Sequence, residues 1–215
     1  MLAIFKREFK SYFQNVIGWL FVAALLAVYG LYFYVYNLKN GYPYISYDLN
    51  GIGFIMMIAV PILTMRSLSD EKKTKTDQLM LTSPVSVGKI VAGKYFAMAA
   101  VYTIDIALFA LSPLVLSIYG KVALSEAYVA LFGYWLYGLS CIAVGLFISS
   151  ISESVIISAI LTFAALFLSY MMQSITGLIS SSGNLLTKVL NCFDLYTPFE
   201  NFVSGCFSVT SAAYM

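Results

Sequence analysis

The sequence predicts an all-α fold, a polytopic bundle of membrane-spanning helices. Of its 215 residues, 61% are hydrophobic and only 10% are charged, which is far from the mix of a soluble globular domain. The charges gather in a few short stretches and leave long apolar runs that no small soluble core could enclose. These runs are continuous rather than alternating, which favours helices over the strands of a barrel. We therefore expect residues 1–215 to form a single transmembrane domain.

Five apolar runs are long enough to cross a bilayer. The first, residues 16–38, would be about 35 Å long as a helix. It is too long for the core of a signal peptide, and no small-residue cleavage pattern follows it, so we expect it to remain in the mature protein. The other four predicted spans cover residues 51–68, 95–119, 127–149 and 155–179.

Lysine and arginine residues predict the orientation of the spans. Nine of the 12 precede the first span or lie at or between the second and third spans. The other three, Lys39, Lys121 and Lys188, lie in connections on the opposite side. Because positive residues concentrate on the cytoplasmic side of a membrane, we expect the N-terminus and the loop of residues 69–94 to be cytoplasmic.

Residues 180–212 are predicted to form an outer-face segment after the fifth span. Its apolar part is too short to cross the membrane, so we expect residues 198–212 to dip into the outer leaflet as a re-entrant element. A sixth span is then expected to follow Met215 in the native gene. Cys192 and Cys206 lie in this segment, either as a disulfide on the outer face or as two small apolar residues.

Aromatic residues cluster around the end of the first span. They form either an aromatic belt at the outer interface or the lining of a vestibule. The residues are Tyr29, Tyr32, Phe33, Tyr34, Tyr36, Tyr42, Tyr44 and Tyr47.

Residues 1–15 are predicted to form an amphipathic helix at the inner interface. At about 100 degrees per residue, its apolar side chains fall in one arc and its charged residues lie outside that arc. The apolar face would then contact membrane lipid. The helix serves either as a topology anchor or as a contact for a cytoplasmic partner. The candidate contact residues are Phe5, Arg7, Glu8 and Phe9.

The loop of residues 69–94 is the predicted docking element for soluble partners. Asp70 and Glu71 suit the first turn of a helix, which could extend to Leu81 before Pro84 ends it. The alternative is a solvated charged loop that only sets topology. The candidate partner contacts are Asp70, Glu71, Thr76, Leu79 and Met80.

The segment Gly88–Tyr95, GKIVAGKY, matches a phosphate-binding loop except at its last position. A tyrosine stands there in place of the hydroxyl residue that binds magnesium, and no strand precedes the segment. We therefore expect no nucleotide site in this chain. The sequence has no histidine, which removes histidine bases and most zinc ligand sets, and a net charge of +2 does not indicate a nucleic-acid partner.

Asp105 lies about ten residues into the third predicted span, where a carboxylate is costly. It is either an intramembrane site or the partner in a hydrogen bond to a Tyr, Ser or Thr of another helix.

Prolines and small residues also lie within the predicted spans. Pro61 in the second span and Pro113 in the third would kink their helices, which suits a moving transporter and a static bundle equally. Small residues recur on the fourth span and would let another helix approach closely. They are Gly138, Cys141, Gly145 and Ser149.

Four segments together resemble type-2 ABC exporter permeases, specifically the group that includes the gliding-motility-associated permeases. They are FKREFKSYFQNVIGWLF, RSLSDEKKTKTDQLMLTSPVSVGKIVAGK, GLFISSISESVIISAIL and TPFENFVSG. The second segment is the most specific. The family's pattern maps onto Glu71, Lys72 and Lys73, Thr76, residues 79–81 and 84–86, and Gly93 with Lys94. Lys75 stands where the family usually has glycine, which makes the turn before Thr76 less typical, and Asn15 with Val16 stands where Ser-Pro is common.

This resemblance implies a six-span permease that dimerises in the cytoplasmic membrane of a bacterium. It implies no cofactor in this chain, because separate ATP-binding subunits would hold ATP and magnesium. The helix of residues 69–81 would couple those subunits to the spans, with the N-terminal helix beside it. An extracytoplasmic accessory protein is a further expected partner. The other functions considered are a membrane scaffold that recruits a cytoplasmic protein and a channel with Asp105 on its path, and the transported substrate stays open.

Overall fold

The computed structural model describes residues 2–76, 86–119, 122–179 and 196–203, and the side chains of these residues except 173–179 and 201. Within these ranges every regular element is a helix. In chain order they are α1 (Leu2–Gln14), α2 (Val16–Phe33), the π-helix η1 (Tyr34–Lys39), α3 (Ser46–Thr64), α4 (Ser69–Lys73), α6 (Val87–Phe109), α7 (Ser112–Tyr119), α8 (Leu124–Ile151), α9 (Val155–Ile179) and α11 (Tyr196–Val203). The all-α bundle is confirmed.

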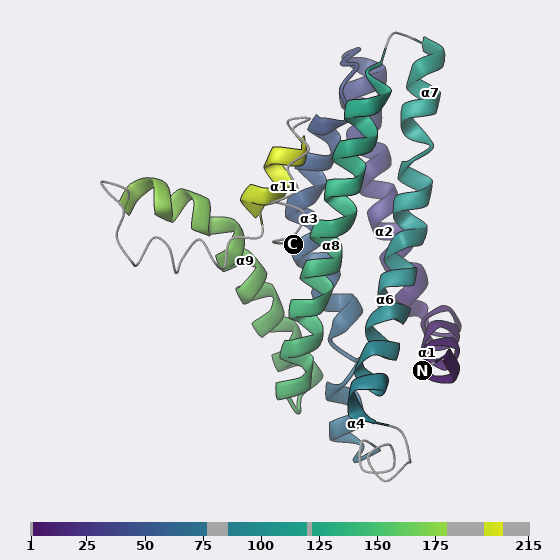
Figure 1. The fold of residues 1–215 in the computed structure, drawn as a ribbon, viewed down its shortest axis with the longest axis vertical. Helices are drawn as coiled ribbons and strands as arrows, with labels where there is room; N and C mark the ends of the chain where they lie inside the picture. The colour runs from purple at the N-terminus through teal and green to yellow at the C-terminus, as the bar shows by residue number, and fades with distance from the viewer. Residues whose placement is uncertain (1, 77–85, 120–121, 180–195, 204–215) are drawn as a thin grey trace.

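Five segments of the described chain are long and apolar enough to cross a membrane, one for each predicted span. They are α2 with η1, α3 with α4, α6 with α7, α8 and the first part of α9, and they run alternately up and down the bundle in Figure 1. The predicted start of the third span at residue 95 is wrong, because α6 begins at Val87. An apolar run marks the lipid-facing length of a helix, whereas backbone hydrogen bonds carry this helix two turns further.

Helix α1 is a separate element that folds back on the bundle. Asn15 has extended backbone angles (φ −89°, ψ 155°) and separates α1 from α2. At Gly18 a Cβ atom would lie 2.5 Å from the Tyr12 carbonyl oxygen, so only glycine permits this close return. Helix α1 therefore packs against α2 and α6, near the end of the bundle that carries α4 (Figure 1).

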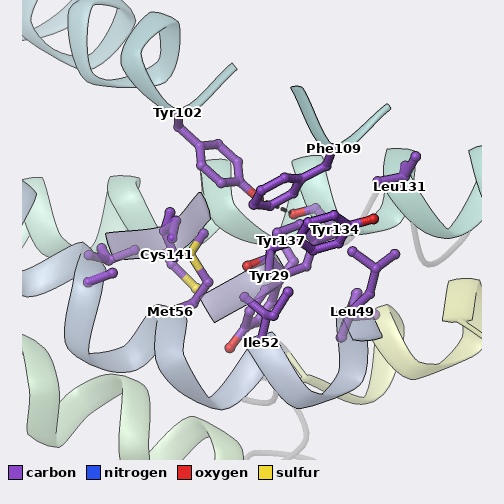
Figure 2. Packing of buried hydrophobic residues seen from close by; sticks show 14 of the residues in the cluster. Tyr29, Leu49, Ile52, Met56, Tyr102, Phe109, Leu131, Tyr134, Tyr137 and Cys141 are labelled. Atoms are coloured by element: carbon purple, nitrogen blue, oxygen red, sulfur yellow. Dashed lines mark hydrogen bonds between the residues drawn. The ribbon is translucent and has the colours of Figure 1, made fainter. Parts of the chain in front are cut away.

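The core between α2, α3, α6 and α8 is rich in aromatic rings (Figure 2). Tyr29 stacks on Phe109 with ring centroids 4.1 Å apart, and the Tyr102 hydroxyl donates to the Tyr134 carbonyl oxygen at 2.6 Å. The expectation that Tyr29 belongs to an outer aromatic cluster is wrong, because its side chain is only 6% exposed. Its ring packs inside the bundle, and its hydroxyl forms a hydrogen bond with the Ser112 hydroxyl.

The small residues of α8 do let neighbouring helices approach. A Cβ at Gly138 would lie 2.3 Å from Tyr102 Cζ on α6, and one at Gly145 would lie 2.5 Å from Thr64 Oγ1 on α3. Ser149, at the end of the same stripe, is fully buried. The predicted packing role of this stripe is confirmed, and it serves two different helices.

Helix α11 returns to the bundle after the fifth span and packs against α3, α8 and α9. Phe199 and Phe202 are fully buried, and Gly133 of α8 leaves room for the Phe202 side chain. This is the described part of the predicted re-entrant element. The rest of that element, together with Cys192 and Cys206, lies outside the described residues.

The first and third spans each depart from a regular α-helix. The third span breaks between α6, which ends at Phe109, and α7, which begins at Ser112 directly before Pro113, as the proline predicted. Sequence reasoning missed the π-helix η1. In it the buried Asn37 donates to the buried Asp48 of α3, so a polar pair joins the first two spans.

Candidate functional site

Helix α4 follows α3 after the turn of residues 65–68 and is the central element of the candidate site. Asp70 and Glu71 lie in its first turn, and Lys72 and Lys73 in its last turn, so the charges complement the helix dipole at both ends. The predicted helix start is confirmed. The predicted continuation toward Leu81 is wrong at its first step, because α4 ends at Lys73 and a turn follows through Thr76.

Lys75 explains why α4 stops. Its φ is +57°, the left-handed conformation that glycine adopts most easily, and it stands where the resembled family has glycine. The Lys75 N–H donates to the Lys72 carbonyl (3.1 Å) and the Thr76 N–H to the Glu71 carbonyl (3.0 Å). These two bonds form a Schellman motif, which closes the helix although the residue at its turn is not glycine.

Replacing Lys75 by glycine should strengthen this helix end. Glycine removes the strain of a left-handed lysine, so we expect about 0.5–1 kcal/mol of additional local stability. Hydrogen exchange at the amides of Thr74 and Thr76 should slow by roughly two- to fivefold. Lys73→Gly, within the helix, is the matched control and should speed the same exchange. Equal effects of the two glycines would contradict the proposed cause.

The beginning of α4 is fixed to the end of α8. Both the Leu68 and the Ser69 backbone N–H groups donate to Ser149 Oγ at 3.2 Å, and Ser69 Oγ donates to the Ser149 carbonyl oxygen at 3.1 Å. Lys72 Nζ donates to the carbonyl oxygen of Ser150. Ser149 thus supplies the acceptor that the first turn of α4 lacks within its own helix.

The other side of α4 is fixed by a buried lysine on α6. Lys94 is 2% exposed, and its ammonium lies 2.7 Å from Glu71 Oε1, 3.4 Å from Glu8 Oε1 and 2.9 Å from the Ser67 carbonyl oxygen. Arg7 lies 2.7 Å from Glu8 Oε1 and 3.9 Å from Glu71 Oε1. We call Arg7, Glu8, Glu71 and Lys94 the charge cluster. It joins α1, α4 and α6.

An open cavity of about 430 Å³ lies beside the charge cluster, between α1, the end of α3, α4 and α6. Most of its lining residues are polar, and Tyr12 is the one aromatic residue among those described. Burial, and next the charge of Glu8, raise the pKa of Tyr12, so its hydroxyl stays protonated and donates to the Leu63 carbonyl oxygen (3.4 Å). The cavity is also lined by Ser11, Asn15, Arg66, Asp70, Thr74 and Thr76.

The structure brings most of the predicted contact residues of the N-terminal helix and of the loop to one place. Arg7, Glu8 and Glu71 form the charge cluster, and Asp70 and Thr76 line the cavity. Phe5 and Phe9 stack on one another with ring centroids 5.8 Å apart, as part of a ring series that continues to Phe13 and Trp19. Leu79 and Met80 lie outside the described residues.

Sequence reasoning missed Lys94 and the structural role of Ser149 toward α4. The available signal for Lys94 was a lysine next to the apolar run of the third span, where a charged residue requires a partner. The segment Gly88–Tyr95 that includes Lys94 is helical. A methyl group at Gly88, in the first turn of this helix, would meet no atom within 4 Å.

Asp105 lies on the core face of α6, one turn from Tyr102 and from Phe109, and is fully buried. Both of its carboxylate oxygens are buried without a hydrogen-bond partner among the described residues. The predicted hydrogen bond to a Tyr, Ser or Thr is therefore not formed in this part of the chain. Asp105 does not contact the cavity beside the charge cluster.

Replacing Asp105 by asparagine should stabilise the bundle. The amide keeps the shape and carries no charge, so it is easier to bury than a carboxylate without a partner, and we expect about 1 kcal/mol, or ~2–4 °C in the thermal midpoint. The exposed Glu153→Gln is the control and should change the midpoint little. A lower midpoint for Asp105→Asn would show that the carboxyl group binds something in the membrane.

The fold and the site together define a multi-pass membrane protein in which a charge cluster joins the N-terminal helix α1 to the second and third spans. The family model for ABC-2 family transporter proteins matches residues 32–212, well over half of the chain. The chain therefore belongs to the ABC-2 transporter family, and is a membrane permease component of an ABC transporter rather than its catalytic subunit. No curated protein and no solved structure matches it.

Proposed function

We propose that this chain is the permease subunit of an ATP-driven exporter of the gliding-motility-associated group. It acts as a dimer in the cytoplasmic membrane of a bacterium, with its N-terminus and α4 in the cytoplasm. A separate ATP-binding subunit holds ATP and magnesium and contacts α4 and α1. An extracytoplasmic accessory protein is a further partner on the opposite side.

One observation carries this proposal: the short polar helix α4 is attached to three other helices. Glu71 reaches Lys94 of α6 and Arg7 of α1, and Ser69 is bonded to Ser149 of α8. A solvated loop that only set topology would need none of these bonds. A helix that receives force from a soluble partner needs all of them, because force is transmitted only through elements that are packed or bonded together.

The residues that remain accessible on this end supply the contact surface. Asp70, Lys73 and Thr76 are exposed on α4 and its following turn, and the cavity between α1 and α4 opens beside them. We propose that the ATP-binding subunit contacts Asp70, Glu71 and Thr76 there, together with Arg7 and Glu8 of α1. Leu79 and Met80 complete the contact in the same proposal.

Two experiments test the proposal. The permease is purified from its native membrane, and a stoichiometric ATPase in the complex supports it, whereas an ATPase-free complex would support a scaffold instead. In intact cells, the cysteine of a Lys73→Cys variant should be protected from a membrane-impermeant thiol reagent. The cysteine of a Tyr44→Cys variant should react with it. Both variants carry serine at positions 192 and 206. A reactive Lys73→Cys in sealed cells would overturn the orientation and the mechanism with it.

A further inference from the structure

The Lys94 ammonium contacts two other elements, through two hydrogen bonds and one further ion pair. An ammonium group has three donors and no acceptor. Two of these donors are used by the Glu71 carboxylate on α4 (2.7 Å) and the Ser67 carbonyl oxygen just before α4 (2.9 Å). The Glu8 carboxylate on α1 lies at ion-pair distance (3.4 Å). One side chain of α6 therefore holds both α1 and α4.

The charges around Lys94 are balanced. Two cations, Arg7 and Lys94, face two carboxylates, Glu8 and Glu71. Lys94 is 2% exposed and the two carboxylates are 15% and 19% exposed, whereas Arg7 is 56% exposed. Removing the buried cation would leave Glu71 without its main partner and Glu8 with Arg7 alone, which is much less favourable than the intact set.

We propose that Lys94 is the positioning residue that makes α1, α4 and α6 move as one body. The inference rests on the proposed function, in which an ATP-binding subunit displaces α4. With Lys94 in place, any displacement of α4 carries the start of the third span and the N-terminal helix with it. Without Lys94, α4 stays attached to α8 through Ser69 and Ser149 but moves independently of α6, and only the long Arg7–Glu71 contact (3.9 Å) still links it to α1.

Distance measurements between spin labels on the complete complex test this proposal. Labels at Lys73→Cys on α4 and Lys89→Cys on α6 occupy exposed positions near the charge cluster. Cys192 and Cys206 are replaced by serine, and Cys141, which is 0% exposed, escapes labelling. In the otherwise unchanged protein we expect one narrow distance distribution that is the same without nucleotide and with ATP and magnesium.

The Lys94→Met variant should lose this behaviour. Its 73–89 distance should broaden and should change when ATP binds. Lys10→Met, an exposed lysine of α1, is the matched control and should leave the distribution unchanged. The proposal is overturned if Lys94→Met keeps a narrow distance that ignores ATP, or if the unchanged protein already alters its 73–89 distance on ATP binding.

A milder variant keeps the test valid if Lys94→Met fails to fold. Glu8→Gln weakens only the longest of the three Lys94 contacts, at 3.4 Å. A label pair at Lys6→Cys and Lys73→Cys should then broaden while the 73–89 pair stays narrow, and the opposite result would overturn the proposal. Single Lys73→Cys labels report the distance between the two protomers. If that distance is the same with and without ATP, the proposed function fails. The widths of the 73–89 and 6–73 distance distributions still test the role of Lys94 in that case.

Discussion

Replacing Gly138 by leucine is expected to abolish the folded bundle. A single Cβ atom at this position would lie 2.3 Å from Tyr102 Cζ, 2.4 Å from Cε1 and 2.5 Å from the hydroxyl oxygen. The Tyr102 ring has no free space into which to move, because it is fully buried and its hydroxyl is bonded to the Tyr134 carbonyl (2.6 Å). Helices α6 and α8 would have to separate, which exceeds the ~1–3 kcal/mol of ordinary overpacking.

The measurement is the yield of monodisperse protein after detergent extraction, together with the thermal midpoint of Gly138→Ala. We expect no folded Gly138→Leu protein and a midpoint lowered by more than about 5 °C for Gly138→Ala. Gly30→Ala on α2 is the control, because a methyl group there meets no atom within 4 Å. Tyr102→Leu should restore part of the loss in Gly138→Ala. Without any restoration, the clash is not the cause.

Reversing the charge of Glu71 is expected to stop coupling and leave insertion intact. Glu71→Lys places an ammonium beside Lys94, whose present distance to Glu71 Oε1 is 2.7 Å, and leaves Glu8 as the single carboxylate for three cations. Helix α4 would then lose its contact with α6, because like charges at this separation repel strongly in a shielded site. The ATPase activity that the permease stimulates in its partner should fall at least tenfold.

Glu153→Lys is the matched control for this reversal. It is an exposed glutamate in the short connection between α8 and α9, at the same end of the bundle, and it lies outside the charge cluster. Both variants should reach the membrane in equal amounts by quantitative immunoblot. Normal stimulated ATPase activity in Glu71→Lys would contradict the role proposed for α4, and so would an equal loss in Glu153→Lys.

The spans and the packing stripe could be predicted because each depends on local chemistry. A continuous apolar run needs only length to become a span, and the sequence around Gly138 and Gly145 shows small residues at helical spacing. The predicted start of the third span at residue 95 is wrong because Gly88 and Lys89 lie outside the apolar run and yet belong to helix α6. Helix ends depend on hydrogen bonds as well as on hydropathy.

The candidate site could be predicted only in its parts. Arg7, Glu8 and Glu71 were expected to contact partners because they lie on polar segments next to spans. Both carboxylates also contact Lys94, which is 23 residues after Glu71 along the chain and on another helix. No periodicity links such residues. The left-handed Lys75 was foreseen only as a departure from the glycine of the resembled family.

Ser149 sets how independently the fourth span can act. Its hydroxyl oxygen accepts two backbone N–H groups, from Leu68 and Ser69, at the same distance of 3.2 Å. A turn of α8 about its own axis, or a slide along it, would lengthen both bonds together and expose two amides with no substitute acceptor. Transport-related rearrangements of α8 must therefore either stay smaller than the tolerance of a hydrogen bond or carry the α4 end of the second span along.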